Sequence, residues 1–360
     1  MKRLYTYIVL LAAAAMGLSS CEYEFDNGSL TKETSIYVEG RLSNSDTNVI
    51  RIVKTLPYNM KVAAKDSAAL NVTAVSSLEL LRDGSGQQVF YADEAVGSVP
   101  KGSYYTVGAF HPGEKVTLKA GMEGVKKVSA ETVIPQDVNW EYEVAEAISE
   151  ADAHNVFHIT ISFDNAPDTD EFYGIQVEVR SNVTFYNEDG TVNPYYGQDY
   201  IYALNPPVDD SDDDIESIMA GEGDSHVFEY ENIYLCDDSS LRTGRNTIAY
   251  DAKLWGPYYY FGMARTKGGD DRDSGKPVKV RTLQEYRVTL YSLSRELYRW
   301  YASQYNARYN PLAELGLCPP SFAYGNIKNG IGCFAGVCGT SSGWIVINDN
   351  WVDIDKALYY

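Results

Sequence analysis

The chain has 360 residues, a formal net charge of −20 and 44% hydrophobic residues, the composition of an acidic globular protein. Nucleic-acid binding and docking on anionic lipid both need concentrated lysine and arginine, so this charge argues against both functions. Tyrosine is unusually frequent, with 30 residues against 11 phenylalanines, which favours β-strands and partly wet surfaces. The length beyond a signal peptide predicts two domains.

The first twenty residues are typical of a bacterial signal peptide. Lys2 and Arg3 give a basic start, and residues 4–16 form an apolar run that is shorter than the ~20 residues of a membrane-spanning helix. The run ends in Leu-Ser-Ser-Cys at Cys21, which resembles the lipobox of bacterial lipoproteins. We therefore predict a signal peptide over residues 1–20 and lipid attachment at Cys21, with an ordinary signal peptide as the alternative.

A polar acidic segment, residues 21–34, follows the cysteine. Glu22, Glu24 and Asp26 lie directly after Cys21 and resemble the signal by which Bacteroidota place lipoproteins on the outer face of the outer membrane. The alternative is a flexible tether without a sorting role. Because two or three acyl chains hold a protein stably at a membrane, we predict an outer-membrane protein that is lipid-anchored and faces the cell exterior.

Residues 35–136 show the short-strand pattern of an all-β sandwich. Ile36 and Val38 alternate with polar residues, and a turn-rich segment separates them from an apolar, β-branched run. Asp83-Gly84 is a hairpin signal, and glycines interrupt the later strands at short intervals. We predict an N-terminal β-sandwich over this range.

Residues 137–360 continue the β-rich pattern and contain one convincing helix. "VFHITISFDNAPDTDEFYGIQVEVRS" holds two alternating strands joined by a polar turn, and "GWIVIND" indicates a closing strand. Ser294 is suited to cap a helix near residues 294–307. An apolar stripe at helical spacing comprises Leu293, Leu297, Trp300, Tyr301 and Tyr305. We predict that this stripe packs on a sheet within a second, C-terminal β-rich domain.

Three local patterns suggest a metal or phosphate site, and each is weak. His154 and His158 fall on one face of a predicted strand, where lone imidazoles are usually ordinary surface residues. The acidic loop of residues 205–225 offers oxygens to calcium, but Ile215 replaces the glycine of the EF-hand spacing, which favours a solvated loop. "KGGDDRDSGKP" lacks the glycine spacing of a phosphate loop. We predict neither a metal nor a cofactor.

Four cysteines follow the lipid attachment site: Cys236, Cys318, Cys333 and Cys338. An even number in an exported chain predicts two disulfides, for which three connectivities are possible. A local bridge between Cys333 and Cys338 would close a tight loop, and free thiols are the alternative. A zinc site is weak because the chain has no Cys-x-x-Cys pair.

Three segments, taken in order, resemble one known family. They are "IYVEGRLSN", "YRVTLYSLSRELYRWYASQYN" and "YGNIKNGIGCFAG", and the lipobox cysteine precedes them. The last segment matches the family's terminal pattern at Asn326, Ile327, Asn329, Gly330, Gly332 and Phe334. The chain resembles the Bacteroidota lipoprotein family labelled domain of unknown function 4249. This resemblance implies two β-rich parts, the first immunoglobulin- or transthyretin-like, and an accessory role beside TonB-dependent transporters. It supplies no catalytic residues.

The resulting functional prediction is a non-enzymatic accessory or ligand-binding component of a TonB-dependent nutrient uptake system. Clustered rings at Trp255, Tyr258, Tyr259 and Tyr260 are candidates to bind a glycan or a peptide, with strand surface and core as the alternative. A fimbrillin-like structural or adhesive protein is the second hypothesis, and it would require strand exchange and a cleaved N-terminal strand.

Two further predictions concern chemistry at single sites. No spacing singles out a pair of catalytic carboxylates and no HExxH motif occurs, so we predict that the protein is not an enzyme. Ser67 lies in an Asp-Ser-Ala sequence, the pattern of O-glycosylation in Bacteroidota, and is a candidate for that modification.

Overall fold

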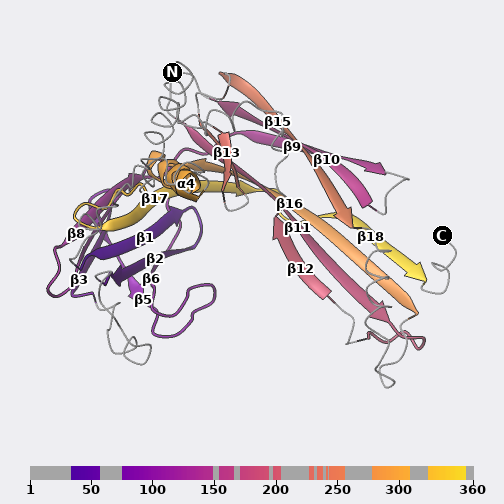
Figure 1. The fold of residues 1–360 in the computed structure, drawn as a ribbon, viewed down its shortest axis with the longest axis horizontal. Coiled ribbons are helices and arrows are strands. Elements are labelled where there is room, and N and C mark those ends of the chain that lie inside the picture. The colour runs from indigo at the N-terminus through magenta and orange to yellow at the C-terminus, as the bar shows by residue number, and fades with distance from the viewer. Residues whose placement is uncertain are drawn as a thin grey trace, which may run out of the picture.

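The computed structural model describes residues 34–56, 75–148, 154–165, 171–193, 198–203, 227–230, 233–237, 241, 243–255, 278–308 and 323–353. The fold is mainly β, as predicted, and within these residues the strands form three sheets and there is one helix. Figure 1 shows the N-terminal strands, in indigo, at the left of the view. The long strands β11 and β16 run to the right, below β9, β10 and β15.

The largest sheet joins strands from both ends of the chain. Its eleven strands follow the order β13 (Val227–Tyr230), β14 (Ile233–Asp237), β11 (Phe172–Tyr186), β16 (Lys279–Leu293), β17 (Ile331–Ser341), β1 (Ile36–Ser43), β2 (Thr47–Lys54), β6 (Tyr104–Val107) and β5 (Phe90–Tyr91), with β12 (Gln198–Ala203) paired to β11 and β18 (Ile345–Asp353) paired to β16. A four-stranded sheet has the order β4 (Ser85–Gln87), β3 (Ser77–Arg82), β7 (Lys115–Gly121), β8 (Val128–Val133). A three-stranded sheet has the order β15 (Gly244–Trp255), β10 (His154–Asn165), β9 (Trp140–Ile148).

The N-terminal strands form a β-sandwich whose core follows from the alternation in the sequence. In β1 the side chains of Ile36, Val38 and Leu42 are fully buried, whereas the alternate residues Tyr37, Glu39 and Arg41 are partly buried or exposed. They share one apolar cluster with Leu80 and Leu118 of the four-stranded sheet. The predicted Asp83-Gly84 turn joins β3 to β4, and both residues have positive φ, at 46° and 81°.

A second sandwich forms where the three-stranded sheet packs on β11 and β16. Ile161 and Phe163 of β10 share an apolar cluster with Val177 of β11 and Val288 of β16. The two alternating strands predicted here, β10 and β11, are confirmed, but they are not paired with each other. β10 pairs with β9 and β15, whereas β11 pairs with β16 over all 15 of its residues.

Helix α4 (Arg295–Arg308) confirms both the predicted helix and its cap. The backbone N–H of Leu297 donates to Ser294 Oγ at 3.4 Å and to the Ser294 carbonyl at 3.0 Å. The predicted stripe is core: Leu297 and Tyr301 are buried, and Trp300 and Tyr305 pack against the same cluster. Tyr298, which lies outside the predicted stripe, is also buried and stacks on Phe172 at 4.7 Å.

Strand β17 connects the two sandwiches. Its first part pairs in parallel with β1, from Tyr37↔Ile331 to Ser43↔Val337. Its last part pairs antiparallel with β16, from Leu293↔Val337 to Thr289↔Ser341. The sequence of this segment is rich in turn formers, yet it forms an 11-residue strand. Phe334 is fully buried in the core of the N-terminal sandwich, so a residue near the C-terminus completes a sandwich that begins at β1.

An asparagine just before β17 and a glycine within it fix the position of this strand beside β1. The Asn326 side chain donates Nδ2 to the Phe334 carbonyl at 2.7 Å, and its Oδ1 accepts from the Phe334 N–H at 2.9 Å. Gly332 has φ of 108°, and a Cβ there would lie 2.0 Å from the Val38 carbonyl oxygen. The motif therefore serves backbone geometry.

We expect Asn326→Ala to lower the free energy of unfolding by about 1–3 kcal/mol, because it leaves two backbone groups of Phe334 without their side-chain partner. Asn44→Ala is a matched control, since Asn44 makes the same two-bond contact with Gly339 at 3.0 and 3.3 Å in an exposed position. There, water replaces the lost bonds and the cost is smaller. Urea denaturation of both variants measures the difference, and equal costs would contradict the role assigned to Asn326.

Candidate functional site

The outer face of β11, β16 and β18 carries two clusters of ion pairs and aromatic rings. The residues of β11 and β16 that face β9–β10–β15 are mostly apolar and buried. The alternate residues point to the other face and are only partly buried, because side chains alternate along a strand. Glu178 and Arg180 of β11 therefore lie opposite Arg287 and Glu285 of β16.

These four residues form two ion pairs between β11 and β16, beside a tryptophan. Arg180 contacts Glu285 at 2.6 Å, and Arg287 contacts Glu178 at 2.5 Å. Both guanidinium groups lie over the ring of Trp344, each 4.7 Å from its centroid. We call these five residues the Trp344 stack. Its charges cancel, and each guanidinium is already held by a carboxylate and a ring.

A second cluster lies further along the same strands. Arg281 of β16 forms a two-bond contact with Asp349 of β18, with Nε–Oδ1 at 2.7 Å and Nη2–Oδ2 at 2.8 Å. This hydrogen bonding lowers the pKa of the Asp349 carboxyl. The Arg281 guanidinium also lies over Trp351, 5.5 Å from the ring centroid, and Tyr186 of β11 lies 5.1 Å from the same ring. We call Tyr186, Arg281, Asp349 and Trp351 the Trp351 platform.

A cleft of about 570 Å³ lies between the N-terminal sandwich and the start of α4. It is lined by Lys115, Glu131, Thr132, Val133, Pro135, Gln136, Glu171, Phe172, Ser292, Leu293, Ser294, Arg295 and Glu296. Lys115 pairs with Glu131 at 2.8 Å, and Thr132 Oγ1 donates to Glu296 at 3.4 Å. The volume suits a small ligand, but the lining contributes charges of both signs and does not select one ligand class.

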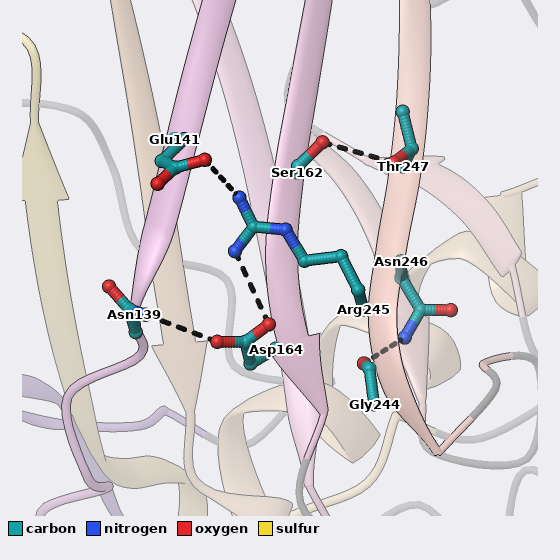
Figure 2. Close-up of polar contacts among 8 residues, drawn as sticks. All are labelled: Asn139, Glu141, Ser162, Asp164, Gly244, Arg245, Asn246 and Thr247. Carbon is teal, nitrogen blue, oxygen red and sulfur yellow. Dashed lines mark hydrogen bonds and ion pairs between the residues drawn. The ribbon is translucent and has the colours of Figure 1, made fainter.

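A third polar cluster lies on the solvent face of β9, β10 and β15 (Figure 2). Arg245 of β15 reaches across the sheet to Glu141 at 2.5 Å and to Asp164 at 3.2 Å, and Asn139 donates to Asp164 at 3.1 Å. The Glu141 side chain is 77% exposed. Exposed ion pairs of this kind contribute ~1 kcal/mol or less, so we assign the cluster to cross-strand pairing rather than to chemistry.

The cysteines differ from the sequence prediction. Cys236, Cys333 and Cys338 are buried free thiols, as in the alternative left open by the sequence, and the local Cys333–Cys338 bridge that the sequence allows does not form. Both residues lie on β17, five positions apart, which places them on opposite faces and separates them by ~16 Å, far beyond disulfide reach. Cys338 instead donates to Asp137 Oδ1 at 2.8 Å. Burial raises the pKa of both β17 thiols to about 12, which makes them unreactive.

The other predicted site residues are only partly covered by the structure. Trp255 is the last residue of β15 and is paired in register with His154, while His158 is exposed on the same strand as His154. Among the residues that the structure describes, no group of three or more potential metal ligands forms. Outside them lie Cys21, Ser67, Tyr258, Tyr259, Tyr260, Cys318 and the acidic loop 205–225. The binding role of the ring cluster stays a prediction.

Sequence reasoning missed one catalytic pattern, a G-x-S-x-G match from Gly339 to Gly343. In hydrolases this pattern forms a sharp turn from a strand into a helix. Here it joins strand β17 to strand β18. Ser341 Oγ accepts from the Thr289 hydroxyl at 3.4 Å and from the Gly343 N–H at 3.3 Å, and neither group is a base. The geometry of a nucleophile elbow is therefore not present at Ser341.

Comparison with known families gives one match. Within the described part of the chain, no helix has the length and apolar character to cross a membrane. A search of curated proteins finds no match. The family model described as Domain of unknown function (DUF4249) matches residues 21–342, which is most of the chain. The protein therefore belongs to the DUF4249 family, as the lipobox and the three sequence segments predict.

Proposed function

We propose that the protein is a lipid-anchored outer-membrane lipoprotein on the cell surface, a non-enzymatic accessory or ligand-binding component of a TonB-dependent nutrient uptake system. The lipobox ending at Cys21 supports the anchor, and the acidic residues after it support surface exposure. Membership of the DUF4249 family is consistent with this proposal. The outer face of β11, β16 and β18, with its exposed tryptophan, supports a binding role over a catalytic one.

The observation that carries the proposal is the place of β1 in the fold. β1 follows a tether, residues 21–34, that spans at most ~50 Å when extended. The strand is hydrogen-bonded on one side to β2 and on the other to β17. Lipid at Cys21 would therefore hold a strand at the centre of the largest sheet, and the folded body would stay close to the membrane.

The same observation weighs against the fimbrillin-like alternative. Strand exchange in such a protein requires that an N-terminal strand leave the sandwich after cleavage. Removal of β1 would take Ile36, Val38 and Leu42, all fully buried, out of the core and would leave β17 without its parallel partner. A permanent tether fits this arrangement better than a removable strand.

We expect metabolic labelling with a palmitate analogue to mark the wild-type protein, and Cys21→Ala to lose both the label and the outer-membrane fractionation. Two or more acyl chains account for stable membrane binding, so their loss releases the protein. Cys338→Ala is the control, because its thiol is buried and it is expected to keep the label. An unlabelled wild-type protein, or an anchored Cys21→Ala variant, would contradict the proposal.

Copurification separates the two functional classes. From detergent-solubilised outer membranes, the acylated protein is expected to bring down a TonB-dependent transporter. If it brings down none, and electron microscopy shows fibres that contain the protein, the fimbrillin-like alternative replaces the uptake role.

A further inference from the structure

The Trp351 platform has the most exposed tryptophan side chain of the described chain. Trp351 is 55% exposed, and the other ring in contact with it, Tyr186, is partly buried. The Trp344 stack lies on the same face, but Trp344 is less exposed and two guanidinium groups already lie over its ring. Among the residues of this face whose side chains the structure describes, only the platform therefore offers a large, open aromatic surface.

Three neighbouring strands hold the platform. Arg281 of β16 lies in register with both Thr184 of β11 and Trp351 of β18. Tyr186 lies two residues beyond Thr184 on β11, on the same face of the sheet, and is paired in register with Lys279. The two rings thus approach each other across the central strand, over the Arg281 side chain. Continuous backbone ladders fix these positions, and groups held on strands keep a more exact geometry than groups on loops.

The platform is locally neutral although the chain carries a net charge of −20. Arg281 is matched by Asp349, and the next pair along the strands, Lys279 and Asp353, lies 3.8 Å apart. The Arg281 guanidinium and the Asp349 carboxylate therefore place hydrogen-bond donors and acceptors side by side, and their charges cancel. An anionic ligand would gain nothing from this arrangement and would be repelled by the rest of the chain.

These properties match the surface of a sugar ring. A pyranose has one face of C–H groups that packs on an aromatic ring and a rim of hydroxyls that both donate and accept hydrogen bonds. We propose that the Trp351 platform binds a pyranose unit of a neutral glycan. The sugar's C–H face stacks on Trp351, and adjacent hydroxyls bond to Arg281 and Asp349. This inference rests on the proposed function, for which it names the ligand class.

A protein partner fits the platform less well. Stable protein interfaces bury ~1,200 Å² or more around an apolar centre. The exposed ring of Trp351 is instead bordered by the ion pairs of Arg281 and Lys279, which suit a ligand rimmed with hydroxyls better than the apolar centre of a protein interface.

The test uses the full acylated chain in detergent. Native gels cast with neutral polysaccharides (mannan, xylan, β-glucan and dextran) are expected to retard the wild-type protein in at least one case. Titration of that protein with the matching oligosaccharide is expected to change its tryptophan fluorescence. Trp351→Ala is expected to weaken glycan binding roughly ten-fold or more. Arg281→Lys is also expected to weaken glycan binding, because lysine cannot form the two-bond contact with Asp349 that holds the polar side of the platform.

Trp344→Ala is the matched control, since it removes an indole from the same face without touching the platform. It is expected to bind the glycan like wild type, and Trp351→Phe, which keeps a ring, is expected to recover part of the binding. Thermal unfolding checks that each variant is folded. The inference is overturned if wild type binds none of the neutral glycans, if it binds only anionic polysaccharides or peptides, or if Trp351→Ala binds like wild type.

Failure of this inference and failure of the proposed function give different results. Trp351→Ala leaves Cys21 and β1 intact, so palmitate labelling and copurification with a transporter are expected to be unchanged. Loss of glycan binding with both of these retained supports the platform, whereas an unlabelled wild-type protein argues against the uptake role whatever the gels show.

Discussion

Gly332→Ala is expected to prevent stable folding of the whole chain. The added Cβ would lie 2.0 Å from the carbonyl oxygen of Val38, the residue paired with Gly332 in the parallel ladder of β1 and β17. The backbone at Gly332 also has φ of 108°, which an L-residue with a side chain rarely adopts. Relief of the clash requires the two strands to separate, so we expect a loss of more than ~4 kcal/mol.

Gly343→Ala separates the clash from the backbone strain. Gly343 also has positive φ, 73°, but nothing lies within 4 Å of the Cβ position. Its substitution therefore costs only the strain of a left-handed residue, ~1–2 kcal/mol. Urea denaturation followed by circular dichroism compares the variants. If Gly332→Ala costs no more than Gly343→Ala, the close approach of β17 to β1 is wrong.

Local features of the fold could be predicted from the sequence because their signals lie within a few residues. Ser294 followed by a stripe at helical spacing gives α4 and its cap. Alternation gives β1, β10 and β11, an apolar β-branched run gives β2, and Asp83-Gly84 gives a hairpin turn. Each of these elements depends on side chains and backbone angles that the local sequence already specifies.

The position of β17 could not be predicted, for two physical reasons. Asn44 and Gly339, which clamp each other, are 295 positions apart, and parallel pairing leaves no turn between the partners as a signal. The glycines of the segment also resemble turn formers. They occur in a strand here because β1 and β8 approach the backbone closely: a Cβ on Gly336 would lie 2.6 Å from the Val133 carbonyl oxygen.

The candidate site was partly accessible from the sequence. The sequence predicts an aromatic surface at Trp255 and the tyrosines after it, where the rings are neighbours in the chain, and that prediction lies largely outside the described residues. The Trp351 platform draws its rings from β11 and β18, and only strand pairing with β16 brings Tyr186 and Trp351 together. The same limit applies to the Cys333–Cys338 bridge that the sequence leaves possible: it needs a tight loop, whereas both residues lie on strand β17.

Residues 35–136 expressed alone are expected not to fold, although the sequence predicts them as one domain. The isolated segment lacks Phe334 and Ile327, which are buried in its apolar cluster, and loss of a single buried phenylalanine side chain already costs ~3–5 kcal/mol. It also leaves one edge of β1 without backbone partners. A small domain with a total stability of ~5–15 kcal/mol is not expected to survive both losses.

A fusion provides the control for this fragment. Residues 323–343, joined after residue 136 through a Gly/Ser linker of about twenty residues, restore β17 and are expected to give a folded sandwich with dispersed amide resonances. Phe334→Ala in the fusion is expected to abolish the rescue, because the core loses its largest contribution from β17. If residues 35–136 fold without this segment, the N-terminal sandwich is an independent domain and β17 is dispensable to it. If the fusion folds and residues 35–136 alone do not, the smallest folding unit combines segments from both sandwiches, and strand β1 depends on residues 323–343 for its stability.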